Sequence, residues 1–401
     1  MQSSRLPLFA LHAYLRCLDL SGRSKHRRCG FDFLVFGTEH ERHPPNSTFH
    51  PTTNGVAVVV GLIPRWATGD RMKRRDFIAL LGGVTAAWSL VARAQQVERM
   101  RRIGVLIPFA ESDAEAQAQV IAFRERLGQL GWTDGRNLRI DYRWAVGGVG
   151  LRAFAKELVE LRPDVIVCRA SPPTAALLQE TKAIPIIFLS VSDPVGDGFV
   201  ASLARPGGNV TGFTNVESSL GGKWLELLKE IAPRVSQVAA IFNPNTAPGG
   251  GSYYRRLVED AAPSFAVKVI ATPVKDAAEI ERAIESFARE RNGALVVLPD
   301  LTTVSNRDLI ISLAARHRLP AVYGFRFFVT HGGLISYGID LVDLYSRGAS
   351  YVDRILRGAK PNELPVQLPT KFELAVNVKT ANALGLRIPQ SISIRADHVI
   401  E

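Results

Sequence analysis

Short apolar runs alternate with segments whose apolar residues recur at helical spacing through most of this chain. Residues 102–108 are apolar and end at a proline, a pattern that predicts a strand buried on both faces. Residues 115–130 then carry apolar side chains at helical spacing, and Gly131 follows as a helix stop. The alternation continues with predicted strands at 137–144, 165–168 and 184–190, and with predicted helices at 151–161 and 172–182.

The pattern breaks at the glycine-rich segment 207–212 and then starts again. The second run predicts helices at 222–231, 254–266, 277–289 and 306–317, and strands at 238–242, 268–272, 294–298 and 320–323. Repeated strand–helix alternation is typical of doubly wound parallel sheets, so two runs predict an α/β protein of two such lobes. Open α/β sheets bind ligands beyond the carboxyl ends of their strands. Facing lobes therefore predict a ligand cleft that closes by a hinge.

A secretory signal peptide is predicted at 72–94. Three basic residues follow Met72, residues 77–92 are mainly apolar, and Ala92-Arg93-Ala94 offers small residues before a cleavage site near Ala94/Gln95. The apolar run is shorter than the ~20 residues that span a bilayer, which favours cleavage over an anchor. The paired arginines also fit twin-arginine export, and the sequence leaves the general and twin-arginine routes open. Residues 1–71 are expected to be a non-native or disordered extension, with Met72 as the true start.

Charge and cysteine content point to a protein held together by its own core. The chain has a formal net charge of +11, but residues 95–401 carry only +4 of it. So small a positive charge does not indicate a nucleic-acid-binding protein. Cys17 and Cys29 lie in the extension, so Cys168 has no partner for an internal disulfide and is expected to be a buried thiol. The histidines outside the extension show no metal-ligand spacing, and no metal is expected.

No motif of enzyme chemistry is present. The chain contains no phosphate-binding or dinucleotide-binding glycine loop, no nucleophile elbow and no zinc-protease helix motif. We therefore expect a binding protein with no catalytic residues and no cofactor.

The candidate ligand-binding residues follow the predicted strands. Ser171 and Pro172 begin a helix whose N-terminus can hold a carboxylate, although the pair also suits plain capping. Asp193 and Asp300 can accept hydrogen bonds from a ligand ammonium, although Asp193 also suits a turn. Aromatic residues near the strand ends, Phe325 among them, can line a pocket or belong to the core. The full predicted set is Phe109, Ser112, Ser171, Pro172, Ser192, Asp193, Asn243, Asn245, Asp300, Thr302, Tyr323 and Tyr337.

Four segments resemble the ABC transporter substrate-binding proteins related to tryptophan- and tyrosine-binding receptors, which have the type I periplasmic binding fold. They are residues 186–212, 332–338, 351–365 and 369–386, and with the strand order the resemblance covers about 101–397. It implies three crossings between the lobes, expected near 211–216, 328–333 and 358–364. The expected lobe 1 is then 101–213 plus 333–358, and lobe 2 is 215–331 plus 362–401.

The resemblance also implies a function. It implies a monomeric periplasmic receptor that binds a small molecule, often an amino acid, and delivers it to the permease subunits of an ABC transporter. Many relatives carry a lipid-bearing cysteine at the cleavage site, but this chain has Gln95 there, which implies a freely diffusing periplasmic protein. A ligand sensor for a membrane signalling protein, or an enzyme on the same scaffold, remains an alternative. A transcription regulator is disfavoured because a signal peptide stands where a DNA-reading motif would be.

Overall fold

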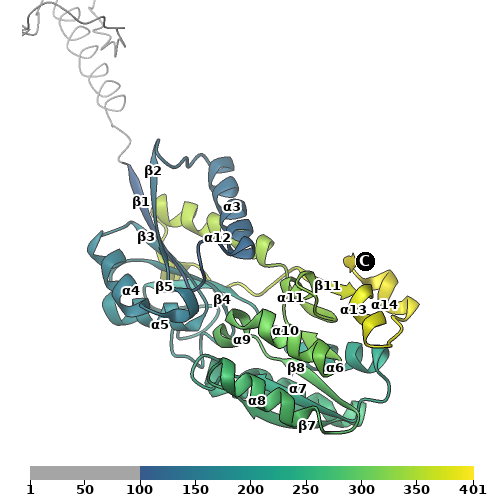
Figure 1. Ribbon diagram of the computed structural model, residues 1–401. Coiled ribbons are helices and arrows are strands. Elements are labelled where there is room, and N and C mark those ends of the chain that lie inside the picture. Colours follow the sequence, from purple (N-terminus) through teal and green to yellow (C-terminus); the bar gives the residue numbers. More distant parts are fainter. Residues whose placement is uncertain (1–99) are drawn as a thin grey trace, which may run out of the picture. The chain divides into compact units, whose positions relative to one another are not determined.

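The structure, a computed structural model, describes residues 100–401 (Figure 1). The predicted extension and signal peptide lie outside these residues. The first lobe contains a five-stranded sheet in the order β2-β1-β3-β4-β5, in which every pairing is parallel. Its strands are β1 (Arg101–Ile107), β2 (Leu138–Trp144), β3 (Val165–Arg169), β4 (Ile186–Val191) and β5 (Val210–Thr214).

Four helices cover the first sheet, and one of them comes from much later in the chain. They are α3 (Ala114–Gln129), α4 (Leu151–Glu160), α5 (Ser171–Glu180) and α12 (Leu341–Leu356). Asp113 caps α3 by accepting a hydrogen bond from the Ala116 amide. Figure 1 shows α12 beside α3, and the Trp132 indole donates a 2.8 Å hydrogen bond to Asp353 of α12. The first lobe is therefore built from two separate parts of the chain.

The second lobe contains a seven-stranded sheet in the order β12-β11-β10-β9-β8-β6-β7. All its pairings are parallel except that of β10 with β11. Its strands are β6 (Gln237–Phe242), β7 (Lys268–Pro273), β8 (Gly293–Val297), β9 (Ala321–Tyr323), β10 (Ile335–Ile339), β11 (Phe372–Asn377) and β12 (His398–Ile400). Its helices are α6 (Leu220–Ile231), α7 (Ser252–Ala261), α8 (Ala277–Phe287), α9 (Leu301–Ser305), α10 (Arg307–Arg316), α11 (Arg326–Thr330), α13 (Val378–Ala383) and α14 (Gln390–Arg395). The prediction of two doubly wound α/β lobes is confirmed.

The cores follow directly from the apolar runs. Every residue of β3, β4 and β8 is buried, as expected for parallel strands covered by helices on both faces. Cys168 lies inside β3 with its thiol 3.3 Å from the Thr174 hydroxyl, and burial raises the pKa of that thiol to about 12. The thiol is thus a packing group rather than a thiolate nucleophile.

Two of the expected lobe boundaries differ from the structure. Strand β10 pairs with β9 and β11, so residues 333–339 belong to the second sheet and not to lobe 1. The chain returns to lobe 1 only at Asp340, which caps α12. Gln367 still pairs with Gly212 and Thr214 at the edge of the first sheet, so the last crossing falls at 368–371 rather than 358–364. The sequence misplaced both points because a short strand and an extended edge segment look alike when their partners are unknown.

Strand β5 was also missed, because its segment reads as a glycine-rich break. Gly212 has φ +157° and lies against Phe188 of β4, where a Cβ would collide with the Phe188 carbonyl oxygen. Here the glycine permits close strand pairing instead of ending the strand. After β5 the chain passes to α6 of the second lobe.

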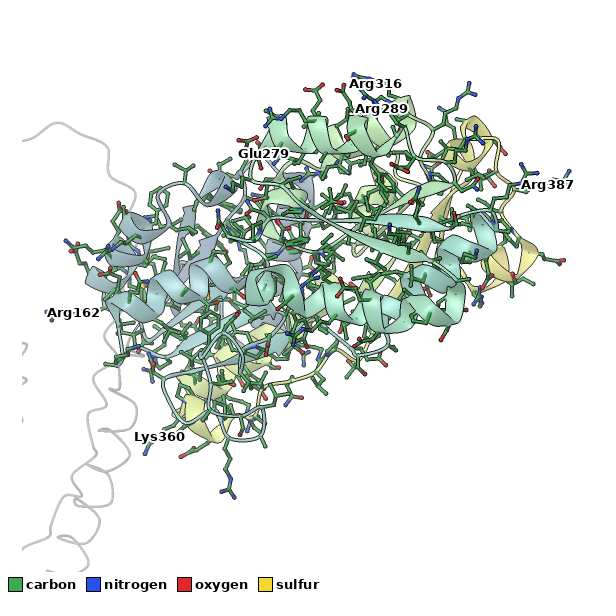
Figure 2. All side chains as sticks on the ribbon, turned by 90° about the horizontal axis from the view of Figure 1, so that it is seen from below. Arg162, Glu279, Arg289, Arg316, Lys360 and Arg387 are labelled. Carbon is green, nitrogen blue, oxygen red and sulfur yellow. The ribbon has the colours of Figure 1, made fainter. Side chains whose placement is uncertain are left out.

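The charged side chains of the described part are mostly on its surface. In Figure 2 the side chains of Arg162, Lys360 and Arg387 project away from the ribbon, and all three residues are exposed. No helix within residues 100–401 is long and apolar enough to span a bilayer. Those residues also hold no group of three His, Cys, Asp or Glu side chains suited to a metal ion.

Candidate functional site

A cavity lies where the carboxyl ends of both sheets meet, with about 420 Å³ of space not filled by protein atoms when the part open to solvent is counted. Most of its lining residues lie at or shortly after the carboxyl ends of β1, β3, β4, β5, β6, β8 and β9, as the strand-end rule for α/β sheets expects. The lining residues are Phe109, Arg169, Ala170, Ser171, Ser190, Ser192, Asn215, Thr246, Pro248, Pro299, Asp300, Leu301, Val304 and Phe325.

Asp300 places a carboxylate in the cavity from the second lobe. It follows β8 and caps α9, so its Oδ1 accepts hydrogen bonds from the Thr303 amide at 2.9 Å and the Thr246 hydroxyl at 3.1 Å. Its Oδ2 accepts from the Asn243 amide at 2.9 Å. The Asn243 side chain in turn donates to the Thr302 hydroxyl, which fixes the loop around the carboxylate. These hydrogen bonds together fix the orientation of the Asp300 carboxylate.

Burial also changes the chemistry of Asp300. The residue is 8% exposed, and this burial raises the pKa of its carboxyl to about 6, although the hydrogen bonds from Asn243 and Thr303 oppose the rise. Each oxygen of a carboxylate can accept two hydrogen bonds, and Oδ2 has one partner among the described residues. Asp300 can therefore accept a further hydrogen bond from a ligand donor, and a cationic donor would stabilise its charged form.

Arg169 places a guanidinium in the same cavity from the first lobe. It is the last residue of β3, is 4% exposed, and donates a 2.9 Å hydrogen bond to the Gln119 side chain. Its Cζ lies 4.4 Å from the centroid of the Phe109 ring, a cation–π distance. Burial lowers its pKa, and no carboxylate of the described residues forms an ion pair with it. A buried guanidinium without a carboxylate partner is suited to an anionic group of a ligand.

Two residues in rare backbone conformations shape the first lobe's side of the cavity. Ala170 has φ 70° and ψ 168°, a region that is almost confined to glycine, and it turns the chain from β3 into α5. Ser190 has φ 60° at an irregularity in the pairing of β4 with β5. Such conformations cost about 1–3 kcal/mol each and cluster at binding sites, where the surrounding structure holds them. Both residues line the cavity.

Polar contacts join the two lobes around the cavity. Arg307 at the start of α10 donates a 2.7 Å hydrogen bond to Oδ2 of Asp113, whose Oδ1 caps α3. The hydroxyls of Ser192 and Tyr254 are 3.0 Å apart and both are buried. These contacts link strand-end loops of the first lobe to helices of the second.

The structure brings four of the predicted site residues to the cavity lining. These are Phe109, Ser171, Ser192 and Asp300. Asn243 and Thr302 lie behind Asp300 in its hydrogen-bond network, and the amide of Asn245 donates to the Asn243 side chain. Pro172 occupies the first turn of α5 beside the lining residue Ser171.

The other four predicted residues lie elsewhere. Asp193 accepts a hydrogen bond from the Gly196 amide and so fixes a turn, and Ser112 is exposed before α3. Tyr323 is buried in the core and stacks on Phe328 at 4.7 Å between ring centroids. Tyr337 stacks on Phe372 between neighbouring strands.

Sequence reasoning missed the polar lining residues Arg169, Ser190, Asn215 and Thr246. The available signal for Arg169 was its position directly after the buried run of β3, where a charged side chain must leave the core or enter a cleft. Asn215 similarly follows β5, a strand that was not predicted.

Comparisons with known proteins identify the family of this chain. A family model for the ABC transporter substrate binding protein matches residues 102–400. The tyrosine-binding protein of Clostridioides difficile (strain R20291) is 28% identical over 266 residues, which cover 66% of this chain and 76% of that protein.

Two solved structures are also similar. A conserved domain protein from Vibrio cholerae has a TM-score of 0.69 at 28% identity, over 75% of this chain and 100% of that one. An ABC domain in complex with L-Trp from Streptococcus pneumonia has a TM-score of 0.69 at 26% identity, over 75% of this chain and 99% of that one. The type I periplasmic binding fold and the resemblance to this family are confirmed. The chain belongs to the ABC transporter substrate-binding protein family.

Proposed function

We propose that this protein is an exported receptor that binds an amino acid, with aromatic amino acids as the first candidates, in the cavity between its lobes. The observation that carries the proposal is the pairing of a buried guanidinium, Arg169, with a buried carboxylate, Asp300, in one cavity. An amino acid carries the complementary pair of charges on neighbouring atoms. Its carboxylate would meet Arg169, and its ammonium would meet Asp300.

The rest of the lining supports the same ligand class. The N-terminus of α5 begins at Ser171 beside Arg169, and the positive end of the helix dipole favours an anion there, although Pro172 and Pro173 have no amide N–H to donate. Phe109 and Phe325 are buried aromatic walls that suit an apolar or aromatic side chain. The relatives named for tyrosine binding and solved with L-Trp support aromatic ligands in particular.

Family membership supports a role in transport outside the cytoplasm. Substrate-binding proteins of ABC transporters are generally extracytoplasmic and work with permease subunits. We extend this to a soluble, monomeric periplasmic protein, because residues 72–94 read as a cleaved signal peptide and Gln95 stands where a lipoprotein would have cysteine. The N-terminal sequence of the exported protein tests this, and a mature end upstream of Met72 would contradict it.

Thermal unfolding of the purified protein tests the ligand class. L-tryptophan or L-tyrosine should raise the melting temperature, since a ligand at 100 times its Kd stabilises the native state by about 2.7 kcal/mol. Tryptamine, without the carboxylate, and indole-3-propionate, without the amino group, should each bind more weakly because each leaves one buried charge unpaired. A folded protein whose melting temperature no amino acid changes would refute the proposal.

Acidification should weaken ligand binding through Asp300. A ligand ammonium pairs with the ionised carboxyl, so affinity should fall as the pH drops below about 6, approaching tenfold per pH unit. The ligand-free protein should respond in the opposite direction. There the pKa of Asp300 is raised above its usual 3.8, so the stability that this group contributes is fully present below 3.8 and is lost as the pH rises through about 6.

Calorimetric titration of L-tryptophan between about pH 5 and pH 8 measures the first effect, and melting curves of the ligand-free protein measure the second. The Asp300→Asn variant should lose the pH dependence of both. A wild-type affinity that stays constant across this range would contradict the role given to Asp300.

A further inference from the structure

Asn215 lies at a special place in the fold. It follows β5 directly, at the first crossing of the chain from one lobe to the other. Asn215 is 6% exposed and lines the cavity. Its Oδ1 is buried and has no hydrogen-bond partner among the described residues. A buried amide oxygen without a donor costs free energy, and native structures rarely leave one so.

Asn215 shares the cavity lining with Ser192, whose hydroxyl lies 3.0 Å from that of Tyr254. An amide oxygen can accept two hydrogen bonds, and the Oδ1 of Asn215 has no donor among the described residues. A donor that a ligand brings into the cavity can therefore supply the missing hydrogen bond.

The free oxygen restricts the ligand to one that brings a donor. Asp300, across the same cavity, is a second acceptor held in place by three protein donors. A primary ammonium carries three N–H bonds on one atom and can donate to both acceptors at once, whereas a single hydroxyl can donate to only one. Two fixed acceptors in one cavity therefore select for an amino group.

We infer that Asn215 is a specificity-determining residue whose Oδ1 accepts a hydrogen bond from the ligand's primary amino group. This inference rests on the proposed amino-acid receptor function. It adds Asn215, in the first crossing segment, as a residue that binds the ligand ammonium. Because Asn215 lies in a crossing segment, an occupied contact also fixes the segment about which the lobes move. Ligands without the amino group leave this oxygen unpaired and gain nothing from it.

The test compares two probes on matched variants of the purified protein. Asn215→Leu removes the amide at similar size, and Asn215→Ala serves if the leucine variant does not fold. Asn382→Leu is the control, because Asn382 is exposed on α13 and does not line the cavity. Calorimetric titration measures the Kd values of L-tryptophan and of indole-3-propionate, which lacks the amino group.

Asn215→Leu should weaken L-tryptophan binding by about tenfold or more and leave indole-3-propionate binding unchanged, since a hydrogen bond to a charged group is lost only in the first case. Asn382→Leu should change neither value. Equal losses for both probes would make Asn215 a structural residue and overturn the inference, as would unchanged L-tryptophan affinity. A wild-type protein that binds indole-3-propionate but not L-tryptophan would refute the contact, and one that binds no amino acid would refute the receptor function as well.

Discussion

Replacing Asp300 with asparagine should weaken the binding of L-tryptophan by about 30-fold or more, because removing one partner of a buried charge pair typically costs 2–5 kcal/mol. Asparagine is nearly as good a helix cap as aspartate, so its side-chain oxygen can still accept the hydrogen bond from the Thr303 amide. Its NH2 group cannot accept from the Asn243 amide, so the variant also loses that hydrogen bond. The ligand-free fold should survive this local cost, and a melting curve of the variant checks it before calorimetry.

Asp193→Asn is the matched control for this variant. The Asp193 carboxylate accepts a hydrogen bond from the Gly196 amide at 2.8 Å and does not line the cavity, so its loss should leave the Kd unchanged. If Asp193→Asn lost affinity and Asp300→Asn kept it, the ligand ammonium would bind at Asp193, which would contradict the role given to Asp300. Binding of indole-3-propionate should be much less sensitive to Asp300→Asn, since that molecule has no ammonium.

Arg169→Met should also weaken L-tryptophan binding by about 30-fold or more, for the complementary reason. The variant removes the guanidinium that would meet the ligand carboxylate and the cation beside the Phe109 ring. The melting temperature of the ligand-free protein should change little. Methionine relieves the burial of an unpaired charge, while the Gln119 side chain loses its 2.9 Å donor, and these effects oppose each other.

Arg143→Met is the control for Arg169→Met, because Arg143 forms an ion pair with Glu157 and does not line the cavity. Its L-tryptophan affinity should equal that of the wild type. Tryptamine, which has no carboxylate, should bind the wild type and Arg169→Met with similar affinity. A large loss of tryptamine affinity in Arg169→Met would assign Arg169 to the packing of Phe109 instead of to the carboxylate.

Apolar runs and helical spacing predicted most strands and helices of both lobes, because parallel strands buried on both faces must be apolar along their whole length. They did not predict β5, because Gly212 is required there by the close approach of the Phe188 carbonyl oxygen in the neighbouring strand, which the sequence does not show. The lobe boundaries that the family resemblance implied also assigned residues 333–339 to the wrong lobe. The place of β10 depends on pairing with β11, which enters the chain more than thirty residues later.

The candidate site was predictable only where position along a strand decides the outcome. Ser171 and Asp300 begin helices directly after strands, so their approach to the cleft follows from topology. Arg169 enters the cavity at the chain reversal made by Ala170, whose φ of 70° no sequence pattern indicates. Asp193 looked equivalent to Asp300, but a local hydrogen bond to Gly196 satisfies it in a turn.

The buried thiol in β3 would allow the proposed closure of the lobes to be measured. A chain that starts at Gln95 contains Cys168 as its single cysteine, and this thiol is 1% exposed with its pKa raised to about 12 by burial. Maleimides and other thiol reagents attack exposed thiolates, so Cys168 should stay unlabelled in the native protein. One engineered cysteine on the surface of each lobe would then accept a pair of dyes without any background substitution. Energy transfer between those dyes would report ligand-dependent closure in real time.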